Sequence, residues 1–238
     1  MSKAIKIAIL DSVQRVYWAD DEGKTDSQKF IDLLAPINPS VSFDVFYVTE
    51  NVFPESLDQY HGILLTGSPA SVHDDYGWIS RLTDLIRQAD TQNKRIVASC
   101  FGHQLVAKTF GGAVGFNEKG WMIGNYGLSI SKQFDWMQTF VSETALFHFN
   151  QERVTRLPEA AISFASTEAY ADYAYTLGDN ILSVQGHPEQ PLSSMNNFLD
   201  VTVHQMDEAS ANKARDKIHD GVPDSGLWAE WMMGFLNR

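Results

Sequence analysis

The feature that most constrains the fold of this chain is the alternation of short apolar runs with amphipathic stretches in its first half. Four apolar runs predict strands, at 5–10, 43–48, 62–65 and 95–99. Three stretches with helical spacing of apolar residues predict helices, at 26–34, 78–91 and 101–110. Strands that alternate with helices form parallel sheets whose two faces are covered. The sequence therefore predicts an α/β protein with an open, mostly parallel sheet and helices on both faces.

The second half of the chain has a different pattern. Strand-like runs dominate between about residues 125 and 184, and the chain becomes helical again after Pro191. The terminal stretch carries an apolar stripe at helical spacing, formed by Leu227, Trp228, Trp231, Met232, Phe235 and Leu236. Such a stripe indicates a helix that packs into the core. No repeat or polar linker divides the chain. We therefore expect a single domain over residues 1–238, with a core at about 5–190 and a helical C-terminal extension at about 191–238.

The charge and the hydropathy pattern argue against several classes of protein. The 30 acidic and 18 basic residues give a net charge of −12, so we expect no nucleic-acid partner. No stretch of about 18 uncharged apolar residues is present, so we expect no association with a membrane. The N-terminal residues resemble a strand rather than a signal peptide, and a lone cysteine suits a reducing compartment. These features predict a cytoplasmic protein.

The single cysteine, Cys100, lies where the predicted strand at 95–99 meets the predicted helix at 101–110. A residue at such a turn lies at the carboxyl edge of the sheet, where open parallel sheets bind their ligands, and Gly102 gives room for a sharp bend. The N-terminus of the helix also favours a thiolate over a thiol. Without this context a lone cysteine is usually a small buried hydrophobic residue, but the position indicates a nucleophile.

His187 and Glu189 are the candidate partners of the cysteine. His187 follows the strand-like run at 181–185, so it lies at a strand end and can serve as general base. Glu189, two residues further on, points to the same side and can accept a hydrogen bond from the imidazole. The backbone N–H of Phe101 is a candidate oxyanion donor, and the glycine turn at 65–69 is a candidate source of a second. No spacing typical of metal ligands occurs, and we expect neither a metal nor a cofactor.

Three segments together resemble the class I, or triad, glutamine amidotransferase family. They are LLTGSPASV at 64–72, ASCFGHQLVAKTFGG at 98–112 and VQGHPE at 184–189, and they follow the family's order along the chain. The resemblance extends from residue 5 to about residue 190. It implies a flavodoxin-like fold and the hydrolysis of a γ-glutamyl amide through a thioester on Cys100. In this scheme His187 is the base and acid, and Glu189 is the carboxylate that orients it.

The resemblance also implies which residues contact the substrate. Gln104 matches the family glutamine that lines the glutamine pocket. Gly67 and Ser68 match the oxyanion loop, in which the family often has glycine at the position of Ser68. Asn150 and Gln151 lie in a segment that contacts the α-amino and α-carboxylate groups of the substrate, and the family often has histidine at the position of Asn150.

Two enzymatic functions and one non-enzymatic function remain open. The motif forms favour a stand-alone cysteine amidohydrolase that cleaves glutamine or γ-glutamyl peptides, so that its partner is a small-molecule γ-glutamyl substrate. The alternative enzyme is the glutaminase subunit of a separate synthetase such as GMP synthase, because 238 residues leave no room for a synthase domain. The non-enzymatic alternative is a redox sensor or interaction module with a flavodoxin-like fold, which leaves the pairing of His187 with Glu189 unexplained.

Overall fold

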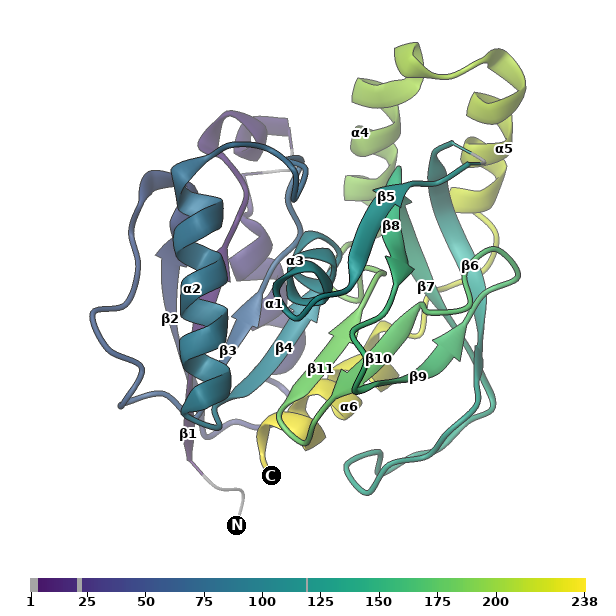
Figure 1. Ribbon diagram of the computed structural model, residues 1–238. Coiled ribbons are helices and arrows are strands. Elements are labelled where there is room, and N and C mark those ends of the chain that lie inside the picture. The colour runs from purple at the N-terminus through teal and green to yellow at the C-terminus, as the bar shows by residue number, and fades with distance from the viewer. Residues whose placement is uncertain (1–3, 21–22, 119) are drawn as a thin grey trace.

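The protein is described here by a computed structural model, which covers residues 4–20, 23–118 and 120–238. The strands within these residues are β1 (Ile5–Asp11), β2 (Val41–Tyr47), β3 (Gly62–Leu65), β4 (Arg95–Ser99), β5 (Ala113–Phe116), β6 (Met122–Ile130), β7 (Glu143–Asn150), β8 (Glu152–Arg156), β9 (Ala161–Ser166), β10 (Ala174–Leu177) and β11 (Ile181–Val184). In this described part of the chain, the main sheet has the order β2-β1-β3-β4-β11-β10-β9-β6-β7, and β5 pairs with β8 in a small second sheet (Figure 1).

One side of the main sheet is parallel. β1 pairs with β2 and β3, β3 pairs with β4, and β4 pairs with β11, all in parallel register. Side chains alternate between the faces of a strand, so Ile7 and Ile9 of β1 enter one apolar cluster while Ala8 and Leu10 enter another. Both faces are apolar because helices cover both. The carboxyl ends of β1, β3, β4 and β11 therefore meet at one edge of the sheet.

Four helices cover the two faces of the parallel part. The helices α1 (Asp26–Leu34) and α6 (Ser225–Leu236) pack in one apolar cluster, and α2 (Gly77–Thr91) and α3 (Phe101–Thr109) pack in the other. Figure 1 shows α2 and α3 on the near side of the sheet and α6 on the far side. The helix α1 begins where the Thr25 hydroxyl accepts a hydrogen bond from the N–H of Gln28 (3.1 Å), which satisfies a free donor of the first turn.

The other side of the main sheet is antiparallel. β10 and β11 form a hairpin, and β9, β6 and β7 lie beyond β10 in the sheet, each antiparallel to its neighbour. A single residue, Gln151, separates the end of β7 from the start of β8, which pairs with β5 in the second sheet. This short connection carries the 149–152 segment past the edge at which the parallel strands end.

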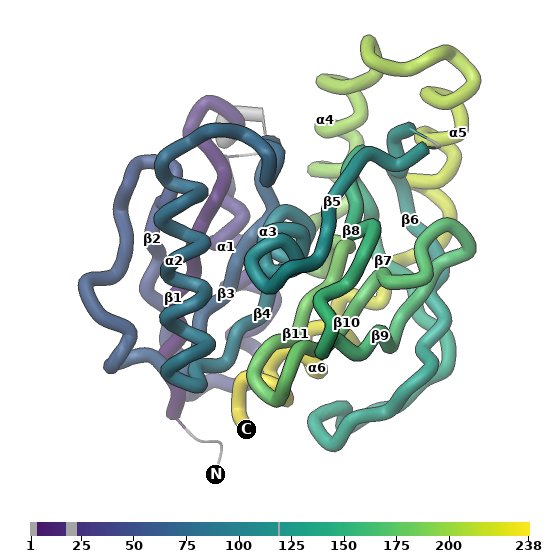
Figure 2. The backbone as a smooth tube through the Cα atoms, viewed as in Figure 1, coloured from purple at the N-terminus to yellow at the C-terminus, as the bar shows by residue number. Residues whose placement is uncertain are grey.

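The helices after β11 have two different locations. The helices α4 (Leu192–Thr202) and α5 (Glu208–Ile218) pack against β6 and β7, in a cluster that includes Ile123, Phe147 and Met195. Figure 2 shows both rising above the antiparallel strands, while α6 passes behind the sheet. The last turn of α6 lies by the start of β4, where the Arg95 guanidinium is 5.7 Å from the centroid of the Phe235 ring. Short 3-10 helices occupy Arg15–Asp20, Val48–Glu50 and Val203–Gln205. None of the helices in the described ranges has the length and apolarity to span a membrane.

The predicted fold class is confirmed, and the predicted helices of the first half agree with the structure to within one residue. The strand predicted at 43–48 lies at 41–47 instead, because Val48 begins a 3-10 helix. Within the strand-like region predicted at about 125–184, residues 170–177 form a strand only from Ala174, since the Thr167 hydroxyl accepts hydrogen bonds from the N–H groups of residues 169 and 170 in a turn. The apolar stripe of the last helix is buried as predicted, with Leu227 only partly so. The division into one core and one extension stays a prediction.

Candidate active site

Cys100 lies on a strained turn between β4 and α3. Its backbone has φ 49° and ψ −105°, a left-handed conformation that costs a residue with a side chain about 1–3 kcal/mol. Its N–H donates to the carbonyl of Val184 at the end of β11 (3.0 Å). The next turn packs closely on β3, because a Cβ on Gly102 would lie 2.6 Å from the Cβ of Leu65. The structure therefore holds the thiol at the carboxyl edge, where the sequence places it.

His187 and Glu189 lie together in the loop after β11. The Nδ1 atom of His187 is 2.8 Å from Oε1 of Glu189, and both side chains are buried. The N–H of His187 donates to the carbonyl of Phe147 in β7 (2.9 Å), which fixes the imidazole between the parallel and antiparallel strands. Burial alone lowers the pKa of His187, but the nearby charges of Cys100 and Glu189 outweigh it and raise the pKa well above its usual value. The imidazole therefore retains its proton beside the sulfur.

Gly67 shows how closely these groups converge. A Cβ on Gly67 would lie 3.0 Å from Cε1 of His187, 3.7 Å from Cβ of Cys100 and 3.8 Å from Oδ2 of Asp26. The turn after β3 thus lies against both the histidine and the cysteine, and its distance from the histidine is one that only glycine permits without a shift. Three elements that are far apart in the sequence supply groups to one small region.

The predicted oxyanion residues lie around the same point. The Ser68 hydroxyl donates to the carbonyl of Ser12 (2.7 Å) and accepts from the N–H of Ala70 (3.1 Å), so the side chain points away from Cys100. Within the described residues, the backbone N–H groups of Ser68 and Phe101 make no hydrogen bond. Two free donors beside a candidate nucleophile are the arrangement that a tetrahedral oxyanion needs.

Gln104 and Asn150 both hold the 149–152 segment in place. The Gln104 amide donates to the carbonyl of Glu152 (2.7 Å) and to Oε1 of Gln185 (3.2 Å). The Asn150 amide donates to the same Glu152 carbonyl (3.1 Å) and to the hydroxyl of Tyr170 (3.0 Å). Gln151 is partly buried. The structure thus brings all three predicted substrate residues to the site, and it gives two of them a clear positioning contact.

Two cavities meet at Cys100. The first has a volume of about 450 Å³ and the second about 340 Å³, and both are within the size range of small-molecule sites. They share Cys100, Ser68 and Gln151 together with an apolar wall of Trp121 and Phe149. Gln104 and Asn150 line only the second cavity, whereas His187 lines only the first. The thiol is therefore accessible from two sides that differ in chemistry.

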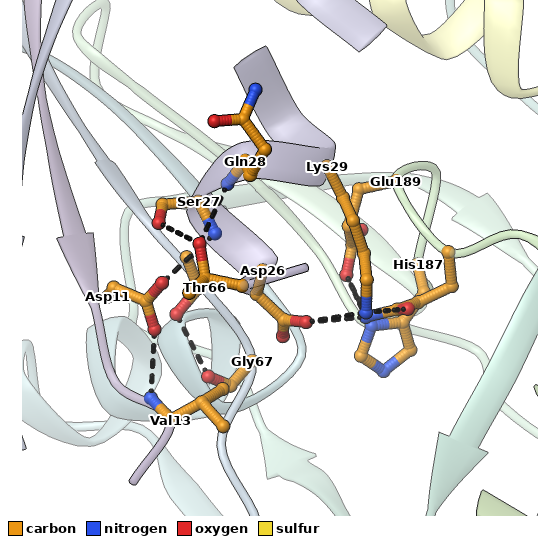
Figure 3. A network of polar contacts seen from close by, with 12 residues as sticks. Asp11, Val13, Asp26, Ser27, Gln28, Lys29, Thr66, Gly67, His187 and Glu189 are labelled. Carbon is orange, nitrogen blue, oxygen red and sulfur yellow. Dashed lines mark hydrogen bonds and ion pairs between the residues drawn. The ribbon is translucent and has the colours of Figure 1, made fainter. Parts of the chain in front are cut away.

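A buried polar network next to His187 is absent from the sequence predictions. Oδ1 of Asp26 accepts hydrogen bonds from Nζ of Lys29 (3.1 Å) and from the amide of Gln190 (2.9 Å). The same Gln190 amide lies 3.3 Å from Oε1 of Glu189, so the network reaches the histidine pair. Figure 3 shows Asp26, Lys29, Glu189 and His187 gathered in this network.

The charges in this network are perturbed by burial. Burial, with the negative charges of Glu189 and Asp11, raises the pKa of Asp26 to about 7. Burial lowers the pKa of Lys29 to about 8. The only local signal for these residues is Thr25 followed by Asp26, which is typical of any helix start. Their proximity to His187 follows from the packing of α1 beside β1, which local sequence does not encode.

The fold and the site define a class of protein: an open α/β protein in which a thiol and a histidine–carboxylate pair meet at the carboxyl edge of the parallel strands. Residues 29–205 match the family model described as glutamine amidotransferase class-I. This match spans most of the sequence, and the chain belongs to the class-I glutamine amidotransferase family. The predicted family and the predicted type of enzyme are thus confirmed.

Individual relatives are similar to different degrees. Gamma-glutamyl peptidase 3 of Arabidopsis thaliana is 29% identical over 204 residues, and the match covers 82% of each chain. The glutamine-hydrolyzing GMP synthase of Porphyromonas gingivalis is 27% identical over 184 residues, which cover 71% of this chain but 35% of the synthase. The solved structure of a glutamine amidotransferase from Thermotoga maritima superposes with a TM-score of 0.75 at 16% identity, covering 98% of this chain and 96% of that one, which shows a shared fold.

Proposed function

We propose that this protein is a stand-alone hydrolase of γ-glutamyl amide bonds, with Cys100 as nucleophile, His187 as general base and acid, and Glu189 as the carboxylate that orients the imidazole. The observation that carries the proposal is the convergence of the thiol and the buried histidine–carboxylate pair beside Gly67. A lone structural cysteine has no use for this arrangement, and the alternative of a redox sensor leaves it without a role.

The first half of the reaction forms a thioester. Before the reaction His187 has already taken the proton of the thiol, and the thiolate sulfur attacks the γ-carbonyl carbon, so that a C–S bond forms and the carbonyl electron pair moves to oxygen. The N–H groups of Ser68 and Phe101 stabilise this oxyanion. His187 then gives its proton to the amide nitrogen, the C–N bond breaks, and the amine leaves. The raised pKa of His187 supports this step, because a protonated imidazole is ready to donate.

The second half of the reaction releases glutamate. His187, now neutral, takes a proton from a water molecule as the water oxygen attacks the thioester carbon. The C–S bond breaks, the thiolate returns beside the imidazolium, and the carboxylic acid product ionises. Gln104, Asn150 and Gln151 are the expected contacts of the γ-glutamyl group, through their place around the second cavity.

Two observations bear on the choice between a stand-alone hydrolase and a glutaminase subunit. The match to a γ-glutamyl peptidase covers 82% of both chains, which favours the hydrolase. The match to a GMP synthase covers 35% of that enzyme, which keeps a separate synthetase partner as the second candidate. A single cysteine suits a reducing compartment, so the cytoplasm remains the predicted location.

The test is glutamate release by the purified chain from L-glutamine and from γ-glutamyl peptides that include glutathione. We expect turnover of a peptide by the chain alone. Cys100→Ala and His187→Ala should each lower kcat by about 10³-fold or more with the circular dichroism spectrum unchanged. His73→Ala is the matched control, because His73 is exposed and lies outside both cavities.

Each alternative predicts a different result. A glutaminase subunit would be inactive on peptides and slow on glutamine, and would be retained by a synthetase in a pull-down. A redox sensor would oxidise at Cys100 and would behave the same after His187→Ala. Turnover that survives complete alkylation of Cys100 by iodoacetamide would refute the assignment of the nucleophile.

A further inference from the structure

The two cavities that meet at Cys100 take different parts of the substrate, and this assignment rests on the proposed function. A general acid must reach the nitrogen of the leaving amine, because it delivers the proton that lets the C–N bond break. His187 lines the first cavity and not the second. The amine therefore departs through the first cavity, while the γ-glutamyl group occupies the second, where Gln104 and Asn150 supply polar contacts.

We propose that the first cavity is a leaving-group subsite that selects γ-glutamyl substrates whose amine carries a bulky apolar side chain, with Asp26 as the acceptor for the N–H of the scissile amide. This substrate class is an amino acid or short peptide joined through its amine to the γ-carboxyl of glutamate. Ammonia, the leaving group of glutamine, would leave the subsite empty.

The size and the wall of the first cavity support an apolar occupant. Its volume of about 450 Å³ is much larger than the roughly 30 Å³ share of a small molecule such as water. A row of aromatic rings lines it, with centroids 5.2 Å apart between Trp121 and Phe149 and 4.9 Å apart between Phe149 and Phe198. Trp121 and Phe149 also border the second cavity, whereas Phe198 lines the first alone. Val201 is half exposed and lines the same cavity. Apolar surface of this kind binds a hydrophobic side chain by removing both from water.

The helix α4 supplies the outer part of this wall. Phe198 and Val201 both lie on it, and α4 follows β11 and the His187 loop directly in the chain. The second cavity has no residue of α4 in its lining, which includes the turn after β3, Gln104 of α3 and the 149–152 segment. The C-terminal helices thus give the leaving-group side a surface that the chemistry of the triad does not itself require.

Asp26 supplies the polar anchor of the subsite. The residue is 8% exposed and lines the first cavity. Lys29 and Gln190 both bind Oδ1, and Oδ2 makes no hydrogen bond within the described residues. This oxygen lies near the point by Gly67 that His187 and Cys100 also face. A carboxylate oxygen that opens on the cavity without a partner from the described residues, held beside the reacting atoms, can accept an N–H from the substrate.

The first arm of the test compares leaving groups. We would measure kcat/KM of the full chain for γ-glutamyl-phenylalanine, γ-glutamyl-glycine and L-glutamine. The native protein should prefer the phenylalanine substrate over the glycine substrate by about tenfold or more, and Phe198→Ala should lower this ratio by about tenfold. Asp200→Ala is the matched control on the same helix, because its side chain is exposed and outside the first cavity, and it should leave the ratio unchanged.

The second arm tests Asp26 with two substrates that differ only at the scissile bond, where one has an N–H group and the other an oxygen atom. γ-Glutamyl-benzylamide has an N–H at the scissile bond, and the γ-benzyl ester of glutamate has oxygen there. Asp26→Asn preserves an acceptor for Lys29 and Gln190 but replaces Oδ2 by a donor. It should lower kcat/KM for the amide about tenfold more than for the ester. If Asp26 had a purely structural role, the substitution would lower kcat/KM equally for the amide and the ester.

The outcomes separate the two proposals. Hydrolysis that depends on Cys100 but shows no preference among leaving groups, with a ratio unaffected by Phe198→Ala, would overturn the leaving-group subsite and leave the proposed function standing. An equal effect of Asp26→Asn on amide and ester would remove Asp26 as the acceptor. A native chain that hydrolyses none of these substrates would overturn both proposals.

Discussion

The parallel and antiparallel parts of the main sheet have different tasks at the active site. Cys100, His187 and the Gly67 turn all follow parallel strands, at the edge where the carboxyl ends of β3, β4 and β11 meet. Trp121 precedes β6 and Phe149 lies in β7, so the antiparallel part supplies the apolar wall. The parallel part carries the residues proposed to react with the substrate, and the antiparallel part carries the apolar wall proposed to select which substrate binds.

The difference follows from how each part is built. Parallel strands place consecutive carboxyl ends next to one another, and helices on both faces keep those ends rigid. Antiparallel strands alternate in direction, so only some of their ends reach the same edge. In this protein the two parts are joined by the β10–β11 hairpin and by the hydrogen bond from His187 to Phe147. Changes on the parallel side should therefore affect rate and stability most.

The largest effect is expected from Glu189→Gln on the parallel side. A neutral amide cannot stabilise the imidazolium and can present a donor to Nδ1 of His187, so kcat should fall by about 10³-fold. The charge of Glu189 helps to raise the pKa of His187, so the alkaline limb of the kcat profile should also move to lower pH. Stopped assays of glutamate release from pH 5 to 10 measure both effects. Glu143→Gln, at the exposed start of β7, should change neither, and a matching loss there would contradict the division between the two parts.

The next effect in size is a loss of stability, tested by comparing one glycine-to-alanine substitution in each part of the sheet. Gly102→Ala would place a Cβ 2.6 Å from Leu65 and 3.0 Å from its carbonyl oxygen, so backbone must move, and the free energy of unfolding should fall by about 3 kcal/mol. A Cβ on Gly127 of β6 meets no atom within 4 Å, so Gly127→Ala should change stability by about 0.5 kcal/mol or less. Denaturant unfolding followed by tryptophan fluorescence compares the two variants. If both variants lost the same free energy of unfolding, the parallel part would not be the more tightly packed of the two.

The smallest of the three effects is a pH-dependent gain in stability from Asp26→Asn. The pKa of Asp26 is raised to about 7 in the folded state from the ordinary value of 3.8. Between these values the folded state binds more protons than the unfolded state, so this group makes the native protein less stable as the pH rises from about 4 to about 7. The variant lacks this loss, and should match the native protein near pH 4 and exceed it by about 2 kcal/mol at pH 8.

Unfolding in urea at pH 4, 6 and 8 measures this difference. A difference that is constant across the three values would show that Asp26 does not titrate on folding. A difference that shrinks with rising pH would show that the pKa of Asp26 is lowered in the folded state, so that the Lys29 charge outweighs the effect of burial.

Much of the parallel part could be predicted from the sequence. Its strands and helices have clear periods of two or 3.6 residues, and the turn at Cys100 is flanked by a strand and a helix that are both visible in the sequence. The antiparallel part could be predicted less well from the sequence. The run at 170–177 is rich in tyrosine and alanine, but a turn at Thr167 delays its strand to Ala174. The strands β5 and β8 are short, and their pairing is set by distant residues. Period alone cannot decide where such runs begin to pair.

The sequence by itself determined the fold class, the family and the three residues expected to carry out the reaction, because each depends on local patterns: strand, turn and helix around Cys100, and a two-residue spacing from His187 to Glu189. Only the tertiary structure decided that Asp26 and Phe198 lie on the same side of Cys100 as His187, and that Gln104 and Asn150 lie on the other. Asp26 is about 160 residues before His187, and no periodicity links them. The proximity arises because α1 packs beside β1, which pairs with β3, and the carboxyl ends of these strands meet the loop after β11. This non-local packing creates both the buried carboxylate and the two-sided site.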